Sequence, residues 1–176
     1  MKRHLLLITL ALLLAVSVNA QSIGVYWDEA GTVNEIPGLA PSFTGYVIIF
    51  AEDAVRGASY GLQINPANGV GGASHVFFAS ATYPEGLQIG DPFAAGIDVA
   101  FTDVVYGFGS TPVIVSTLTF VNISGGVAHG QIDVIPPTSG NVEYANGTAE
   151  LYPLAYETNA VANEDMTFGG VKNLFR

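Results

Sequence analysis

Short runs of apolar residues alternate along this chain with clusters of glycine, proline, asparagine and aspartate. Beyond residue 20 the runs are rich in Val, Ile, Phe, Tyr and Thr, and several alternate apolar with polar positions, as half-buried strands do. No stretch of the body combines an apolar period of 3.6 residues with capping signals over ten positions. The pattern predicts nine strands: Ile23–Tyr26, Gly45–Ala51, Ser59–Ile64, His75–Ala81, Ala95–Phe101, Pro112–Val121, Val127–Ile135, Val142–Ala145 and Ala149–Leu154.

The spacing of these strands predicts the fold class. About nine strands within roughly 130 residues is the density of a β-sandwich, and a chain of this length can bury one sufficient core. No internal repeat and no Ser/Thr/Pro-rich linker divides it. We therefore expect an all-β protein with a single antiparallel β-sandwich of about nine strands, such as a jelly roll, over residues 21–154, followed by a C-terminal tail, residues 155–176.

The first twenty residues have the pattern of a secretory signal peptide. Lys2 and Arg3 precede an apolar run, Leu5–Val16, and small residues close the segment at Val18-Asn19-Ala20. The run is shorter than the roughly 20 residues that span a bilayer, and the Val-x-Ala ending suits cleavage before Gln21. We expect a protein that is secreted or periplasmic, with no membrane span in the mature chain.

The charge of the chain restricts its partners. Removal of residues 1–20 leaves three basic residues, Arg56, Lys172 and Arg176, against 15 acidic ones, a net charge of −12. Nucleic acids and anionic lipids need clustered Lys and Arg, so they are excluded. A polysaccharide, a cation or another extracellular protein is the expected partner. The absence of cysteine excludes disulfides and thiolate metal sites.

One tight hairpin is predicted near the end of the sandwich. Asn146-Gly147 can supply the two positive φ values of a type I′ turn, which makes a two-residue loop. That register places Glu143 directly opposite Glu150. Like charges across a ladder are unfavourable, so this pair either protects an edge or holds a cation.

The sequence has no recognisable catalytic motif, and we therefore do not expect an enzyme. His75 and His129 have no metal-ligand partner two or four residues away, and no Gly-x-Ser-x-Gly occurs. Adjacent carboxylates such as Asp28-Glu29, Glu52-Asp53 and Glu164-Asp165 would point to opposite faces of a strand, whereas glycoside hydrolysis needs two that face each other. A small secreted hydrolase that uses loop carboxylates stays as the alternative.

Three consecutive residues are the candidate ligand-binding set. Trp27 is the single tryptophan and follows the first strand, where its ring could stack on a ligand or pack in the core. Asp28 and Glu29 could meet a cation or a polar ligand. No cofactor is predicted, although calcium would suit the oxygen ligands of Asp28, Glu29, Asp91 and Asp103 if these loops converge.

The C-terminal tail ends in a basic and aromatic decapeptide, Thr167–Arg176. Phe168, Lys172, Phe175 and Arg176 give it two of the three basic residues of the mature chain. Against an acidic body, such a tail could fold back onto its own domain, act as an attachment or export tag, or fray.

Three segments resemble secreted bacterial sandwiches of the cohesin-like and carbohydrate-binding-like kind. They are Gly61–Pro66, Tyr83–Leu87 and Pro112–Phe120, which follow the order of a strand ending in a Pro turn, a loop and a long central strand. The resemblance covers residues 22–154 and implies a non-catalytic adhesive or scaffolding module. The tail is similar to an ending, Thr-Trp-Gly-x-Val/Ile-Lys-x-Leu-Tyr-Arg, of uncharacterised exported bacterial proteins, with Phe168 and Phe175 in place of Trp and Tyr.

The leading hypothesis from the sequence is a secreted, non-catalytic binding or scaffolding module at the bacterial cell exterior. Besides the hydrolase, a structural envelope subunit that assembles through exposed edge strands is the other alternative.

Overall fold

A computed structural model describes residues 21–34, 40–65, 76–106, 111–123 and 131–156. The secondary structure in these ranges is strand, with no helix, and none of it has the length and hydropathy of a membrane-crossing helix. Eleven strands are present: β1 (Ser22–Tyr26), β2 (Ser42–Phe50), β3 (Ala54–Asn65), β4 (Val76–Thr82), β5 (Gly86–Asp91), β6 (Gly96–Tyr106), β7 (Val113–Asn122), β8 (Gln131–Ile135), β9 (Glu143–Asn146), β10 (Leu151–Pro153) and β11 (Ala155–Tyr156).

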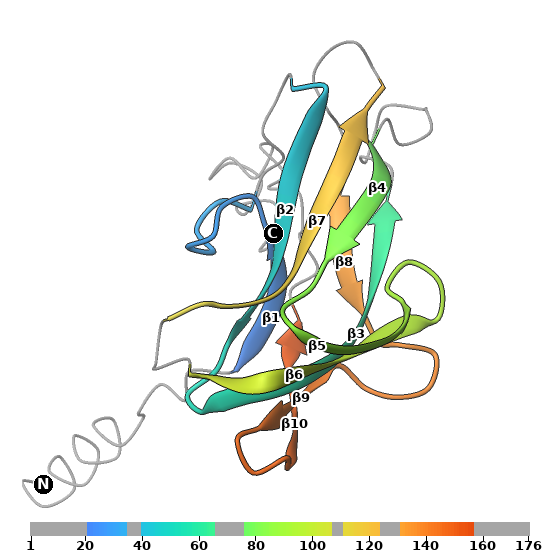
Figure 1. The fold of residues 1–176 in the computed structure, drawn as a ribbon. Helices are drawn as coiled ribbons and strands as arrows, with labels where there is room; N and C mark the ends of the chain where they lie inside the picture. The colour runs from blue at the N-terminus through green and yellow to red at the C-terminus, as the bar shows by residue number, and fades with distance from the viewer. Residues whose placement is uncertain (1–20, 35–39, 66–75, 107–110, 124–130, 157–176) are drawn as a thin grey trace, which may run out of the picture.

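The strands form two sheets packed together as a β-sandwich (Figure 1). Sheet A has the order β11-β1-β2-β7-β4, and sheet B has the order β10-β9-β3-β6-β5. The first half of the long strand β3 pairs with β6 and β9, and its second half pairs with β8. Among the described pairs only β1 and β11 run parallel. The predicted fold class is therefore confirmed.

The core lies between the sheets, where alternate residues of each strand meet. Val47 and Ile49 of β2 face inward with Ile23 and Val25 of β1, and all four are almost fully buried. Sheet B contributes Tyr60 and other β-branched or aromatic residues from β3 and β6. Because strand side chains have a period of two, this inward set fixes which residues face solvent.

A buried hydrogen bond joins the two sheets. The hydroxyl of Tyr60 on β3 donates to Oγ of Ser116 on β7 over 2.9 Å, and both residues are 0% exposed. Burial raises the pKa of Tyr60 far above the ordinary tyrosine value. The neutral phenol is thus the form that the fold requires.

Two details of the strand prediction are wrong, although each of the nine expected strands overlaps an observed one. Residues 83–92, expected to be a loop, contain β5. The hairpin loop also has three residues, 147–149, instead of two, because the N–H of Asn146 donates to the carbonyl of Glu150 over 2.9 Å. Beyond it Leu151 pairs with Ala145 and Pro153 pairs with Glu143. Glu143 and Glu150 are therefore not opposite each other.

The side chain of Asn146 explains the hairpin register. Its Oδ1 accepts hydrogen bonds from the N–H groups of Thr148 (3.0 Å) and Glu150 (2.9 Å) and from the Thr148 hydroxyl (2.8 Å). The N–H of Ala149 bonds to the Asn146 carbonyl over 2.9 Å, and Ala149 adopts a left-handed φ of 66°. A turn followed by a left-handed residue is the usual three-residue hairpin loop, with alanine here at a position that favours glycine.

Candidate binding surfaces

Trp27 lies on the inner side of sheet A, at the end of β1. The centroid of its ring is 5.2 Å from that of Phe43 and 5.7 Å from that of Phe120, both near edge-to-face. A Cβ on Gly45 would come within 2.9 Å of the indole, so the ring fills the space that this glycine leaves. Its indole N–H is buried and has no hydrogen-bond partner among the described residues. Trp27 thus packs with the core, and its stacking on a ligand stays a prediction.

Asp28 closes its own loop. Its Oδ1 accepts hydrogen bonds from the N–H groups of Thr32 (2.8 Å) and Val33 (2.6 Å), and its Oδ2 accepts one from the Thr32 hydroxyl (2.7 Å). The bonds from the Thr32 side chain and the Val33 backbone lower the pKa of Asp28, because they stabilise the charged form. The N–H of Trp27 also donates to the carbonyl of Val33 over 2.7 Å. The carboxylate is therefore part of the loop structure.

The same loop brings Glu29 to the outer side of sheet A. The hydroxyl of Tyr46 donates to the Glu29 carboxylate, and desolvation together with that negative charge raises the pKa of Tyr46. Gly31, with φ of 67°, lies against Phe50 and Ile48, where a Cβ would collide with the Phe50 ring. Ile48 is fully buried beneath this loop, although it points away from the main core. Asp28 and Glu29 thus lie beside the outer face of sheet A.

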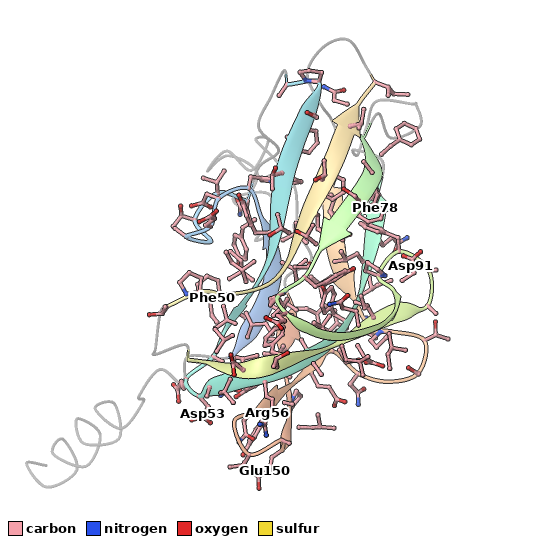
Figure 2. The ribbon with its side chains drawn as sticks, in the orientation of Figure 1. Phe50, Asp53, Arg56, Phe78, Asp91 and Glu150 are labelled. Atoms are coloured by element: carbon pink, nitrogen blue, oxygen red, sulfur yellow. The ribbon has the colours of Figure 1, made fainter. Side chains whose placement is uncertain are left out.

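The other candidate carboxylates lie in separate places. Oδ1 of Asp91 accepts the N–H of Phe93 over 2.9 Å and closes the turn before β6, and Asp103 is exposed on β6. Figure 2 shows Asp91 on the opposite side of the sandwich from Asp53, which lies at the lower end with Arg56 and Glu150. Within the described ranges, no group of three or more His, Cys, Asp or Glu side chains could hold a metal ion.

The tail candidates are not described by the structure. Phe168, Lys172, Phe175 and Arg176 lie outside the described residues, as do His75 and His129. Their roles stay predictions. The first two residues of the predicted tail, Ala155 and Tyr156, form β11 and pair with Ser22 and Ile23 of β1.

A row of apolar and small residues crosses the outer face of sheet B. Leu87 on β5 is opposite Ala100 on β6, Ala100 is opposite Gly57 on β3, Gly57 is opposite Ala145 on β9, and Ala145 is opposite Leu151 on β10. Leu87 and Leu151, at the two ends, are 61% and 64% exposed. The five strands make the row about 19 Å long, at roughly 4.8 Å per strand. We use the name sheet B face for this row together with Ile89, which lies next to Leu87 on the same side of β5.

The next row of the same face is acidic. It runs from Ile89, which is 60% exposed, through Asp98, Ser59 and Glu143 to Pro153. The described residues together hold eleven carboxylates and one basic side chain, Arg56. An exposed aliphatic row on this protein is thus bordered by negative charge.

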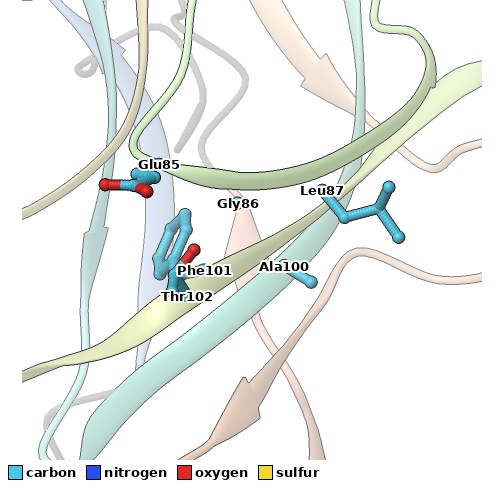
Figure 3. Close-up of a pocket in the computed structure, with 6 residues that line it drawn as sticks. All are labelled: Glu85, Gly86, Leu87, Ala100, Phe101 and Thr102. Carbon is cyan, nitrogen blue, oxygen red and sulfur yellow. The ribbon is translucent and has the colours of Figure 1, made fainter.

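Strand β5 is the exposed edge of this face. All six of its residues are exposed, and it pairs with β6 on one side. A Cβ on Gly86 would collide with the carbonyl oxygen of Ala100, so glycine allows the two backbones to approach. Around Gly86 lies an open hollow of about 450 Å³, lined also by Glu85, Leu87, Phe101 and Thr102 (Figure 3). The hollow therefore lies at the edge of sheet B, beside Leu87.

The sequence pattern did not predict the sheet B face. Leu87 and Ile89 were expected in a loop, and their apolar side chains point outward, opposite to the usual strand pattern. Leu151 was expected in a strand, but its neighbours across the sheet follow from pairings between distant segments. An alternating Leu-x-Ile between two glycines was the signal that could have indicated an edge strand.

Comparison with known proteins gives one structural likeness. No family model matches the chain, and no curated protein matches it. A solved structure, the sixth cohesin of scaffoldin B from Acetivibrio cellulolyticus in complex with a Cel5 dockerin, is similar with a TM-score of 0.44 and 13% sequence identity. The similarity covers 77% of this chain and 93% of that chain. The β-sandwich architecture itself rests on the strand pairings described above.

Proposed function

We propose that this protein is an extracellular, non-catalytic module that binds another protein through the sheet B face. The observation that carries the proposal is the row from Leu87 to Leu151, which leaves a leucine side chain exposed at each end of the sheet with small residues between them. Exposed apolar surface of this kind marks interaction sites in soluble proteins. The predicted signal peptide supports a location outside the cytoplasm.

The exposed side chains would supply a useful part of the binding energy. Leu87, Ile89 and Leu151 are each about three-fifths exposed. Full burial of such a side chain contributes about 1.5–3 kcal/mol, so covering the exposed fractions of all three contributes about 3–5 kcal/mol. The small residues Ala100, Gly57 and Ala145 between them let a partner approach the sheet closely.

The acidic row defines the chemistry of the partner. Asp98 and Glu143 lie one row away from the aliphatic side chains. A complementary surface presents aliphatic or aromatic residues next to Lys or Arg, since like charges across an interface are strongly unfavourable. Binding should therefore weaken as salt concentration rises.

The test is a comparison of partner capture by matched variants. The secreted chain is immobilised as wild type, as Leu87→Asp, as Leu151→Asp, and as Phe77→Asp on the other sheet, and is exposed to envelope and extracellular proteins of the producing organism. We expect a partner that the wild type and Phe77→Asp retain and that both leucine variants lose. Its purified form should bind the leucine variants at least tenfold more weakly. Equal retention by all four proteins would contradict the proposal.

The exposed edge of β5 also favours a second candidate, assembly of copies of this chain. The side of β5 that faces away from β6 pairs with no other described strand, and its backbone could pair with a strand of another copy. Sedimentation of the pure protein distinguishes the two, because edge assembly predicts a mass that rises with concentration and falls in Ile89→Pro. The large negative charge of each copy opposes this assembly, which is why we favour a basic partner.

A further inference from the structure

The outer face of sheet A carries a regular set of hydroxyl groups. Two neighbouring rows cross β2, β7 and β4, and each row is made of three hydroxyl-bearing residues. The residues of the two rows, which we call the hydroxyl array, are Thr44, Thr119 and Ser80, and then Tyr46, Thr117 and Thr82. A β-bulge at Ala79 shifts the register of β4 between Phe78 and Ser80.

Their neighbours along each strand show that these side chains point outward. Gly45 and Leu118, which alternate with members of the array, face the core with Trp27 and Phe120. Thr44, Ser80 and Thr82 are exposed, and Tyr46, Thr117 and Thr119 are partly exposed. The hydroxyl array is therefore a surface that a ligand can reach.

An exposed aromatic ring borders the array. The next row pairs Ser42 with Val121 and Val121 with Phe77 of the edge strand β4, and Phe77 is 50% exposed. Tyr46 and Phe77 stand at opposite corners, two strands and four residues apart along the strands. With a strand spacing of about 4.8 Å and a rise of about 3.3 Å per residue, this diagonal is about 16 Å.

The array also has no charged residue, in contrast to the surface around it. The described residues hold eleven carboxylates, and none belongs to the array or to the row of Phe77. Glu29, which accepts the Tyr46 hydroxyl, lies at its border. A neutral ligand can cover the array without removing a carboxylate from water, which is costly.

We propose that the hydroxyl array binds a neutral polysaccharide. Ser, Thr and Tyr hydroxyls both donate and accept hydrogen bonds, as sugar hydroxyls do. The rings of Tyr46 and Phe77 can pack on the apolar faces of sugar rings, and their separation suits a chain of several sugars. This site is independent of the sheet B face, because the two lie on the outer sides of different sheets.

An aromatic cluster beneath the array holds it rigid. On the inner side of sheet A the ring of Phe120 is 5.7 Å from those of Trp27 and Phe43 and 6.2 Å from that of Phe78. Phe93 completes the cluster at 4.5 Å from Phe78. A surface supported in this way loses little conformational freedom when a ligand binds.

The proposal is tested by retention on neutral polysaccharides. Wild-type protein is incubated with microcrystalline cellulose and chitin, and is run in gels that contain soluble xylan or mixed-linkage β-glucan. We expect retention by at least one of the four. Thr119→Glu, which places a carboxylate in the middle of the array, should weaken it at least tenfold, and Phe77→Ala severalfold. Thr138→Glu, at an exposed threonine outside both surfaces, is the matched control and should bind as the wild type does.

Melting curves of each variant show whether it is folded, and the exposed Thr44→Glu replaces Thr119→Glu if the latter unfolds. Failure of the wild type to bind any of the four polysaccharides would overturn the proposal. So would retention that the array variants leave unchanged. Loss of a protein partner in Thr119→Glu, with no effect on polysaccharide binding, would assign this face to a protein instead.

Discussion

Removal of the Tyr60 hydroxyl tests the contact between the two sheets. Tyr60 and Ser116 are fully buried and joined by a 2.9 Å hydrogen bond. Tyr60→Phe removes a bond with a net contribution of about 1 kcal/mol and leaves the buried Ser116 Oγ without that donor, which costs up to about 1–3 kcal/mol. We expect the free energy of unfolding at pH 7 to fall by about 1–3 kcal/mol.

The pH dependence of this difference is the sharper result. Burial raises the pKa of Tyr60 well above its ordinary value of about 10, so the unfolded chain loses this proton first as pH rises. The stabilisation is complete below pH 10 and declines above it, at about 1.4 kcal/mol for each pH unit while the folded form stays protonated. Phenylalanine has no such proton. The gap between wild type and Tyr60→Phe should therefore shrink by about 1.4 kcal/mol from pH 7 to pH 11.

Urea unfolding at both pH values, followed by far-ultraviolet circular dichroism, measures the gap. Ser116→Ala is the control that keeps the phenol, and its pH dependence should resemble that of the wild type. The double variant should lose about 1 kcal/mol less than the sum of the single variants, because the two hydroxyls interact. A gap between wild type and Tyr60→Phe that stays constant up to pH 11 would refute the argument.

Three further predictions concern the loops. Asp28→Ala should lower the melting temperature at pH 7, and the difference should shrink in acid as pH falls through the lowered pKa of Asp28. A difference that stays constant as the solution is acidified would contradict the role of the charge. Ala149→Gly should raise the free energy of unfolding by about 0.5–1 kcal/mol, because alanine is strained at this left-handed position. The control Ala145→Gly, in strand β9, should lower it, and chemical denaturation measures both values. The melting temperature in excess calcium should equal that in EDTA, because the carboxylates of Asp28 and Asp91 already accept backbone hydrogen bonds. A reproducible rise with calcium would instead show a calcium site.

The architecture was predictable because most strands have one buried face. In β2 and β7 the inward residues recur at alternate positions, and this period is visible in the sequence. Strand β5 has one short alternation, Leu-x-Ile, but no buried face, because it is an edge strand with all six residues exposed. The hairpin loop differs from the predicted two-residue turn because the Asn146 side chain accepts hydrogen bonds from the backbone of Thr148 and Glu150. This local bonding outweighs the type I′ preference of Asn-Gly.

The two proposed binding surfaces could not be predicted from the sequence for a different reason. The sheet B face and the hydroxyl array each combine strands that are distant in sequence, and their rows follow from pairing registers between β3, β6 and β9 or between β2, β7 and β4. A single sequence gives the alternation within a strand but not the neighbour across it. Trp27, Asp28 and Glu29 follow the first strand, as their sequence positions require, and the structure brings Glu29 to the border of the array. Their role in ligand binding stays a prediction.

Site-specific photo-crosslinking tests the central claim most directly. A photoreactive phenylalanine analogue replaces Leu87 on the sheet B face, or Thr82 on sheet A, in the secreted chain within its producing organism. The account predicts a crosslinked protein at position 87, attached through a segment with aliphatic and basic residues, and no such product at position 82. The absence of a protein product at position 87, or the same product at both positions, would contradict it.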